Sequence, residues 1–349
     1  MNRTDLKSMT LGEMKAAFAG QPAFRALQVY HWLHKGVSSF DEMTDLSQSF
    51  RARLAEEYYI AAARIERKYC SQLDDTVKYL FRFNDGEMVE GVLMSYHHGR
   101  TVCISTQAGC KMDCAFCATG KSGFSRNLTA SEMLSQVQAA QLDAGERISN
   151  IVLMGMGEPL DNYEAVLRFL DLVSSEEGMK VGMRHISLST CGIVDKIYDL
   201  AEKKYQLTLS VSLHAPNDAI RSRIMPVNRR WNIEELLRAC RYYAECTGRR
   251  ISFEYAMIEG VNDSAECADE LARRLRGILC HVNLIPVNSV SGSAFRKSSQ
   301  ERLHTFESVL SNHGITATVR RTLGADIEAS CGQLKRRFKE EVANVENFQ

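Results

Sequence analysis

The sequence contains no run of about 20 apolar residues, the length that a helix needs to cross a bilayer. Its first residues, Met1 to Lys7, do not resemble a signal peptide. Net charge is also lacking, because 43 basic residues offset 43 acidic ones. These features predict a cytoplasmic protein with no membrane span, in which any nucleic acid is bound by local basic patches rather than by the overall charge.

The eleven cysteines show no repeating framework of the kind that disulfide-bonded scaffolds have. Their odd number fits a reducing compartment in which thiols serve metals or catalysis. With 45% hydrophobic residues among 349, the chain can bury a large core, as one big domain or as two.

Three of the cysteines, Cys110, Cys114 and Cys117, lie in the run Cys-Lys-Met-Asp-Cys-Ala-Phe-Cys. A cubane cluster has four irons, so three thiolates leave one iron open to a substrate or cofactor. The spacing resembles that of the radical S-adenosylmethionine (SAM) enzymes, in which a [4Fe-4S] cluster holds SAM. Zinc binding or core packing is the alternative, but no second Cys or His pair follows at the spacing of a zinc ribbon.

From residue 101 onward, predicted strands alternate with helices, which favours a parallel sheet with right-handed crossovers. The strands are expected at 101–106, 150–154, 185–189, 207–213, 251–255 and 281–285. Helices are expected at 129–144, 163–173, 233–245 and 264–276, the first with a capping box of Thr129 and Glu132. Six βα units cannot close an eight-stranded barrel. We therefore predict an α/β fold, an open (β/α)6 partial barrel.

The remaining segments flank this barrel. Residues 6–59 are expected to be helical, with Asp41 or Asp45 as caps. Alternating residues at 76–83 and 88–95 around Asn84-Asp85-Gly86 predict a hairpin. A helix at 300–312 and a strand at 316–320 should follow the barrel. The predicted divisions are a helical RNA-binding domain (1–70), a hairpin linker (71–98), the barrel (99–313) and a C-terminal segment (314–349).

Polar residues and glycines follow several predicted strands. Met154-Gly155-Met156-Gly157-Glu158-Pro159 allows close approach of the backbone to a ligand, and Glu158 can accept a hydrogen bond from the SAM ammonium group. A dinucleotide fingerprint is excluded because Leu160 stands where its third glycine would be. An ordinary turn into a helix is the structural alternative. Further candidates for binding SAM are Ser189, Ser212, Leu213, His214 and Asn288. Each of them could instead have a structural role, in a turn or in the core.

Six strings, taken in order, resemble the RlmN/Cfr family of radical-SAM RNA methyltransferases over nearly the whole chain, and more closely the RlmN branch. They are Cys103 to Cys110, Phe116 to Lys121, Phe124 to Thr129, Met154 to Pro159, Ser212 to Asp218, and Cys331 to Leu334. The departures are mild: Ser330 stands where alanine is usual, and Ser289 where proline is common.

The resemblance implies methylation of carbon 2 of an adenosine in the peptidyl-transferase centre of 23S ribosomal RNA and, in some members, of the adenosine 3′ of the tRNA anticodon. It implies two SAM per turnover. Cys331 would become S-methylcysteine and then form an adduct with RNA, Cys103 would release the RNA by forming a disulfide with Cys331, and Glu90 would accept a proton. Without the resemblance, the sequence pattern predicts a core thiol at Cys103 and a solvated hairpin residue at Glu90.

Basic residues flank Cys331 in the sequence: Arg320, Arg321 and those from Lys335 to Lys339. Their positive charges could bind RNA phosphates. The implied partners are 23S rRNA, tRNA and an external electron donor such as flavodoxin or ferredoxin. The protein itself is expected to be a monomer. Three alternatives stay open: a Cfr-like carbon-8 methyltransferase that confers antibiotic resistance, a zinc-dependent RNA-binding protein, and a radical-SAM enzyme with a protein or metabolite substrate. The other six cysteines are expected to be structural.

Overall fold

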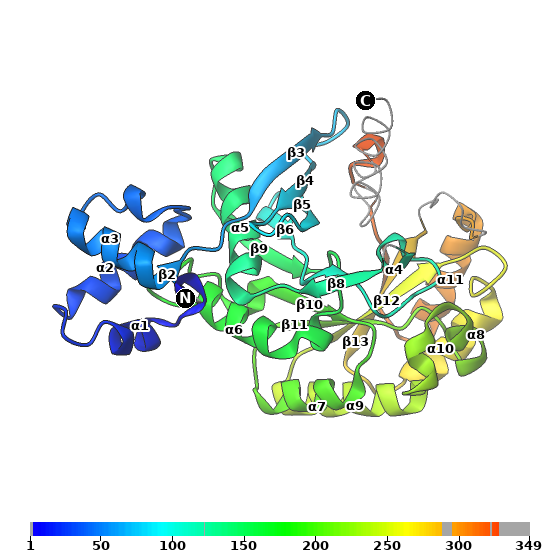
Figure 1. Cartoon of the computed structure of the whole chain (residues 1–349). Coiled ribbons are helices and arrows are strands. Elements are labelled where there is room, and N and C mark those ends of the chain that lie inside the picture. The colour runs from blue at the N-terminus through cyan, green and yellow to red at the C-terminus, as the bar shows by residue number, and fades with distance from the viewer. Residues whose placement is uncertain (1–2, 122, 288–294, 322, 328–349) are drawn as a thin grey trace.

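The computed structural model describes residues 3–121, 123–287, 295–321 and 323–327 (Figure 1). Its centre is a ten-stranded sheet in the order β14-β13-β12-β11-β10-β9-β6-β5-β4-β3. The first and last of these strands, β14 and β3, are the two edges, and they do not pair with one another within this part of the chain. The sheet is therefore open, as the sequence predicted.

Seven strands of the sheet are parallel. They are β6 (Gly99–Cys103), β9 (Ile148–Leu153), β10 (Ile186–Thr190), β11 (Thr208–Ser212), β12 (Ile251–Met257), β13 (Cys280–Pro286) and β14 (Ala317–Val319). Six crossovers connect them, through α5 (Ala130–Ala144), α6 (Tyr163–Ser174), α7 (Val194–Glu202), α8 (Asp218–Ile224) with α9 (Ile233–Thr247), α10 (Ala265–Leu275) and α11 (Gln300–Asn312). The predicted six βα units and the capping box of Thr129 and Glu132 at the start of α5 are confirmed.

The predicted hairpin is β4 (Val77–Arg82) and β5 (Met88–Tyr96), and it is part of the main sheet because β5 pairs with β6. A further strand that the sequence did not predict, β3 (Arg64–Cys70), pairs with β4. The sheet therefore continues across the predicted divisions at 98/99 and 313/314, and the domain limits stay a prediction.

The N-terminal module lies at one end of the molecule, opposite α10 and α11 (Figure 1). It contains α1 (Leu11–Ala17), α2 (Phe24–Lys35) and α3 (Gln48–Glu57), and the short parallel strands β1 (Thr4–Asp5) and β2 (Tyr58–Tyr59) bring its two ends together. The predicted aspartate caps are wrong. Ser47 caps α3, while Asp45 accepts a hydrogen bond from the Trp32 indole.

The two faces of the sheet differ in polarity. The face against the helices carries fully buried apolar residues such as Val102, Leu188 and Phe253. Residues paired across neighbouring strands share a face, so the register identifies the opposite, inner face. It carries Lys78, Glu90, Cys103, Ser187, Ser189, Ser210, Ser212, Ser252, Glu254 and Asn283. The inner face is therefore where polar chemistry can take place. No helix among the described residues is long and apolar enough to cross a membrane.

Candidate active site at the open end of the barrel

The cluster cysteines lie between two short antiparallel strands, β7 (Gln107–Gly109) and β8 (Phe124–Asn127), and directly before α4 (Ala118–Lys121). Gly109 has a φ of 92°, and a Cβ there would lie 2.0 Å from the carbonyl oxygen of Gly123. The Cys110 N–H donates to the same oxygen at 3.0 Å. Only glycine therefore allows the close crossing that shapes this loop.

Cys110, Cys114 and Cys117 all line one cavity of about 300 Å³. Burial raises the pKa of Cys110 to about 12, and the neighbouring Cys117 and Glu158 raise it further. Burial, with Cys117 and Cys110, likewise raises the pKa of Cys114. A raised pKa favours the protonated thiol at Cys110 and Cys114, and binding of iron would displace those protons.

This donor set fits an iron–sulfur cluster. Three thiols converge on one cavity, and thiolates are the ligands that such clusters take. Within the described part of the chain, no three His, Cys, Asp or Glu side chains are arranged to hold a single metal ion. The convergence of the three thiols on one cavity is therefore the observation that supports a cluster site here.

Glu158 lies at the floor of the cavity and is 3% exposed. Its carboxylate accepts hydrogen bonds from the backbone N–H groups of Leu160, at 3.0 Å, and Cys191, at 2.7 Å. Burial raises its pKa, which these donors partly offset. Glu158 thus links the loops after β9 and β10. Gly157, with a φ of 104°, packs so close to Gln107 that a Cβ would not fit.

Most of the other predicted SAM-binding residues are in the same place. Ser189, Ser212 and His214 line the cavity with Gly157 and Glu158. The side chain of Leu213, between Ser212 and His214, belongs to the hydrophobic core instead. Asn288 lies outside the described residues. The structure therefore brings together five of the seven predicted side-chain positions.

His214 is a neutral donor in this cavity. Its Nδ1 accepts a hydrogen bond from the Ala256 N–H at 2.9 Å, which leaves the ring proton on Nε2. Burial lowers its pKa to about 3, and Arg221 contributes to the shift. The Phe116 ring of the cluster loop packs edge-on against the imidazole at 4.8 Å. His214 therefore connects the cluster loop to the end of β11 without carrying a charge.

Arg221 was not predicted, although it orders this part of the site. The side chain is fully buried and donates to the carbonyl oxygens of Cys191, Ser212 and Leu213 and to the Asn228 side chain. Cys191, which the sequence left as a structural cysteine, also lines the cavity. No motif marks Arg221, since an arginine in a helical pattern usually lies on a solvated face.

Glu254, on the inner face of β12, was also missed. It lines the cavity, is 4% exposed, and accepts hydrogen bonds from Ser252 and Asn283, both at 2.8 Å. Burial raises its pKa, while Ser252, Arg320 and Asn283 lower it in part. Arg320, predicted as a phosphate contact, lines the same cavity. A buried carboxyl group and a guanidinium group are thus part of the cavity wall.

Cys103 and Glu90 share the inner face, near this cavity. Cys103 is partly buried, and burial raises its pKa to about 11, with Arg320 and the Met154 N–H lowering it and Glu90 raising it. Glu90 is 1% exposed and pairs with Lys78. The alternative of a solvated hairpin residue is therefore wrong for Glu90. Cys331 lies outside the described residues.

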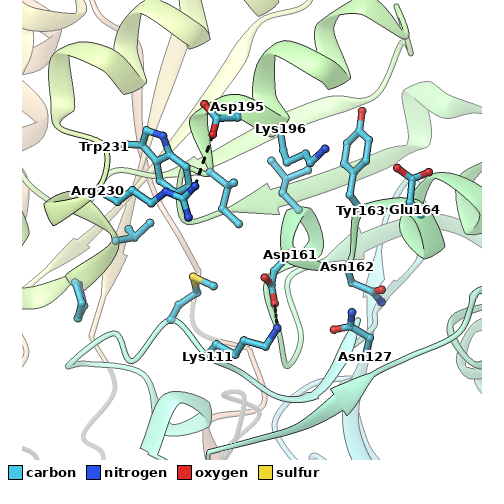
Figure 2. A pocket seen from close by; sticks show the side chains of 15 residues that line it. Lys111, Asn127, Asp161, Asn162, Tyr163, Glu164, Asp195, Lys196, Arg230 and Trp231 are labelled. Carbon is cyan, nitrogen blue, oxygen red and sulfur yellow. Dashed lines mark hydrogen bonds and ion pairs between the residues drawn. The ribbon is translucent and has the colours of Figure 1, made fainter.

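A second cavity, of about 700 Å³, lies on the other side of the cluster loop. Figure 2 shows Lys111 pointing to Asp161, with which it pairs at 2.9 Å, and Arg230 beside Trp231 and Asp195. Met112, the neighbour of Lys111, lines both cavities. The two cavities therefore meet the cluster loop at the same residue, Met112.

Two family models match the chain. The Radical SAM superfamily matches residues 104–275, and the ribosomal RNA large subunit methyltransferase N-terminal domain matches residues 4–60. The first covers the cluster loop and most of the parallel sheet, and the second covers the N-terminal helical module.

Relatives and a solved structure match nearly the full chain. "Probable dual-specificity RNA methyltransferase RlmN" of Alkaliphilus oremlandii is 52% identical over 97% of this chain and 99% of its own. The protein of the same description from Caldanaerobacter subterraneus is 53% identical over the same shares. The crystal structure of a radical SAM methyltransferase from Sphaerobacter thermophilus superposes with a TM-score of 0.90, at 48% identity, over 95% of this chain and 98% of that one.

Proposed function

Because the chain belongs to the RlmN family of radical SAM methyltransferases, which act on RNA, we propose that it methylates carbon 2 of an adenosine in 23S ribosomal RNA and of the adenosine 3′ of the tRNA anticodon. The observation that supports the proposal is that Cys103 and Glu90 share the inner face of the sheet with Ser189, Ser212 and Glu254, which line the cavity of the three cluster cysteines. The protein would bind both RNAs in the cytoplasm.

The chemistry of adenine explains why such a site is needed. Carbon 2 lies between two ring nitrogens and has no nucleophilic lone pair, so it cannot displace the methyl group of SAM directly. A polar site of Ser, His and carboxylate side chains alone would not overcome this barrier. A one-electron route at the ring carbon avoids it.

Cys110, Cys114 and Cys117 would hold the [4Fe-4S] cluster, and the backbone and side chains around Gly157, Glu158, Ser189, Ser212, Leu213, His214 and Asn288 would hold SAM. When bound, the cluster and two SAM molecules per turnover supply a methyl group and one-electron chemistry. The protein holds SAM near a neutral His214 and two buried carboxylates, Glu158 and Glu254. Those carboxylates suit the positive charge of SAM.

Three side chains then carry the RNA chemistry. The Cys331 thiolate would accept a methyl group by displacement, with S-adenosylhomocysteine as the leaving group. The methyl carbon would lose one hydrogen atom to the one-electron chemistry of the bound cofactors and form a bond to carbon 2 of adenine, and the ring would return one electron to those cofactors. Glu90 accepts the proton that carbon 2 loses. The Cys103 thiolate attacks the Cys331 sulfur, the sulfur–carbon bond breaks, and its electron pair stays on the carbon, which takes up a proton to complete the methyl group. A Cys103–Cys331 disulfide is left.

The chain segment before Cys331 is tied to the correct side of the barrel. After β14, at one edge of the sheet, Asp326 accepts hydrogen bonds from Ser71 Oγ at 2.6 Å and from the Gln72 N–H at 2.7 Å, and the Gly324 N–H donates to Asp74 at 2.9 Å. Residues 71–74 join β3 to β4, at the opposite edge. Cys331 is the fourth residue after Ile327, which is a reach of at most about 14 Å. This supports the approach of Cys331 to the β4–β6 side, where Glu90 and Cys103 lie.

We expect Asp326→Ala to slow RNA methylation by about tenfold, because the segment that carries Cys331 loses its anchor. Iron content and thermal stability should not change, since these contacts are at the surface. Rates are measured with radiolabelled SAM and total RNA. Asp269→Ala, on the outer surface of α10, is the matched control. Equal rates in the two variants would show that the contacts with residues 71–74 do not position Cys331.

Glu158→Ala should weaken SAM binding by roughly tenfold or more, because the variant loses the acceptor that fixes the Leu160 and Cys191 backbone in the cavity wall, a loss on the order of 1–3 kcal/mol. Iron content should stay close to that of the native protein. Equilibrium dialysis against SAM on reconstituted protein measures the effect, and Glu164→Ala, outside this cavity, is the control. Unchanged affinity would assign Glu158 a structural role only.

The electron would come from an external donor such as flavodoxin or ferredoxin. The cavity of Lys111 and Trp231 supports an approach from outside the cluster loop, since Met112 lines both this cavity and the inner one.

Mass spectrometry of rRNA and tRNA nucleosides from cells with and without the gene tests the proposal. Loss of 2-methyladenosine from both RNAs is expected. Loss of 8-methyladenosine instead would point to the Cfr-like alternative.

A further inference from the structure

A lysine and a glutamate are buried together on the inner face of the sheet. Lys78, on β4, and Glu90, on β5, are 3.2 Å apart between Nζ and Oε2, and both side chains are 1% exposed. Lysine and glutamate are almost never fully buried unless they are paired. The pair lies inside the described part of the barrel, and nothing in the motif around the cluster accounts for Lys78.

The strand register places this pair directly beside Cys103. Lys78 is opposite Val92 on β5, and Val92 is opposite Cys103 on β6, so the three side chains form one row across the sheet. Glu90 is two residues before Val92 and shares its face. Besides burial, Glu90 contributes to raising the pKa of the Cys103 thiol, in agreement with the face that the two residues share. Lys78 and Cys103 therefore flank Glu90 from the two neighbouring strands.

Stability alone does not explain such a pair. Replacing a buried ion pair with apolar residues is often neutral or stabilising, and the helix-facing side of the same strands is apolar, with Tyr79 and Phe81 fully buried. A carboxylate that has lost its water strongly favours the neutral acid unless a cation compensates. A neutral acid cannot accept a proton. An ammonium group within 3.2 Å supplies the missing compensation.

We propose that Lys78 is a positioning residue that holds Glu90 as an oriented carboxylate beside Cys103, so that Glu90 can accept the proton that carbon 2 must lose before the RNA is released. The inference rests on the proposed role of Glu90. Lys78 would act through Glu90, because its ammonium group contacts one carboxylate oxygen, Oε2. It takes no part in assembling the cluster or in methylating Cys331.

The test follows the stages of the reaction separately. Lys78→Met keeps the length of the side chain and removes its charge, Lys78→Arg keeps the charge, and Lys68→Met, at a partly exposed ion pair on β3, is the matched control. For each, peptide mass spectrometry gives the methyl occupancy of Cys331, and a denaturing gel with and without nuclease gives the lifetime of the RNA-linked protein.

In Lys78→Met we expect the methyl occupancy of Cys331 to stay as in the native protein and the RNA-linked protein to persist at least about tenfold longer. Lys78→Arg should fall within about threefold of the native lifetime, and Lys68→Met should match it. Lys78→Met/Glu90→Gln should behave like Glu90→Gln alone, because the inference has Lys78 affect the reaction through the Glu90 carboxylate. A native lifetime in folded Lys78→Met, or an equal loss of Cys331 methylation, would overturn the inference.

If Lys78→Met does not fold, infrared spectroscopy of the native protein with labelled glutamate decides the question. The inference requires a carboxylate band at pH 7 that is absent from Glu90→Gln, and a protonated carboxyl band would overturn it. This measurement does not depend on the RNA chemistry. If Cys103→Ala and Glu90→Gln gave no RNA-linked protein at all, the adduct route would be wrong, while the spectrum would still report the state of Glu90.

Discussion

Cys103→Ala is expected to accumulate protein covalently bound to RNA, whereas Cys331→Ala is expected to form none. In the first variant Cys331 can still be methylated and joined to adenine, but no thiol on the inner face can attack its sulfur, so each chain reacts once and stops. In the second the methyl acceptor itself is missing. The measurement is a denaturing gel of each variant purified from cells, with and without nuclease.

The matched control is Cys267→Ala, because Cys267 is a partly buried cysteine on α10, away from the cavity. It should behave as the native protein does. A nuclease-sensitive species in Cys331→Ala would mean that another residue carries the methyl group. Normal multiple turnover in Cys103→Ala would mean that another residue resolves the adduct.

Replacing Cys114 with alanine is expected to abolish both cluster assembly and RNA methylation. Its thiol is one of only three that line the cavity as predicted ligands, and two thiolates cannot hold a cubane cluster open for SAM at a single iron. Iron and sulfide, near four each per native chain on family precedent, should fall to background after anaerobic purification. RNA methylation should fall below detection.

The thermal stability of Cys114→Ala separates this effect from misfolding, since the variant should melt as the native protein does after its iron has been removed. Cys246→Ala, on α9, is the control for cysteine loss in general. Cys114→Ala protein that still methylates RNA under reducing conditions would contradict the role of this triplet.

The parallel half of the fold could be predicted because strong apolar strands alternate with capped helices. All six strands expected between residues 101 and 285 are present, and α11 has the bounds that the sequence predicted. β3 was missed because its side chains are mostly charged and exposed at the edge of the sheet. The short helices α7 and α8 were missed because nine and seven residues give too little periodicity to recognise.

The residues of the site could be predicted where a sequence motif marks them. They could not be predicted where only their burial in the folded chain shows that they belong to the site. The three cysteines and the Gly157-Glu158 turn are recognisable in the sequence and line one cavity. Glu90 looked like a solvated residue because it alternates with apolar neighbours, as on any hairpin. Its face is the barrel interior instead, because β5 pairs with β6. Arg221 and Glu254 carry no local signal, since only the fold shows that they are buried.

The most direct test of the account is the origin of the methyl group in the first turnover. Enzyme is purified with Cys331 already methylated in cells, then reacted with RNA and SAM whose methyl group carries three deuterons. The account predicts that the first 2-methyladenosine per chain has an unlabelled methyl group and that later ones have two deuterons and one hydrogen. A first product with three deuterons would show direct transfer from SAM and would contradict the account.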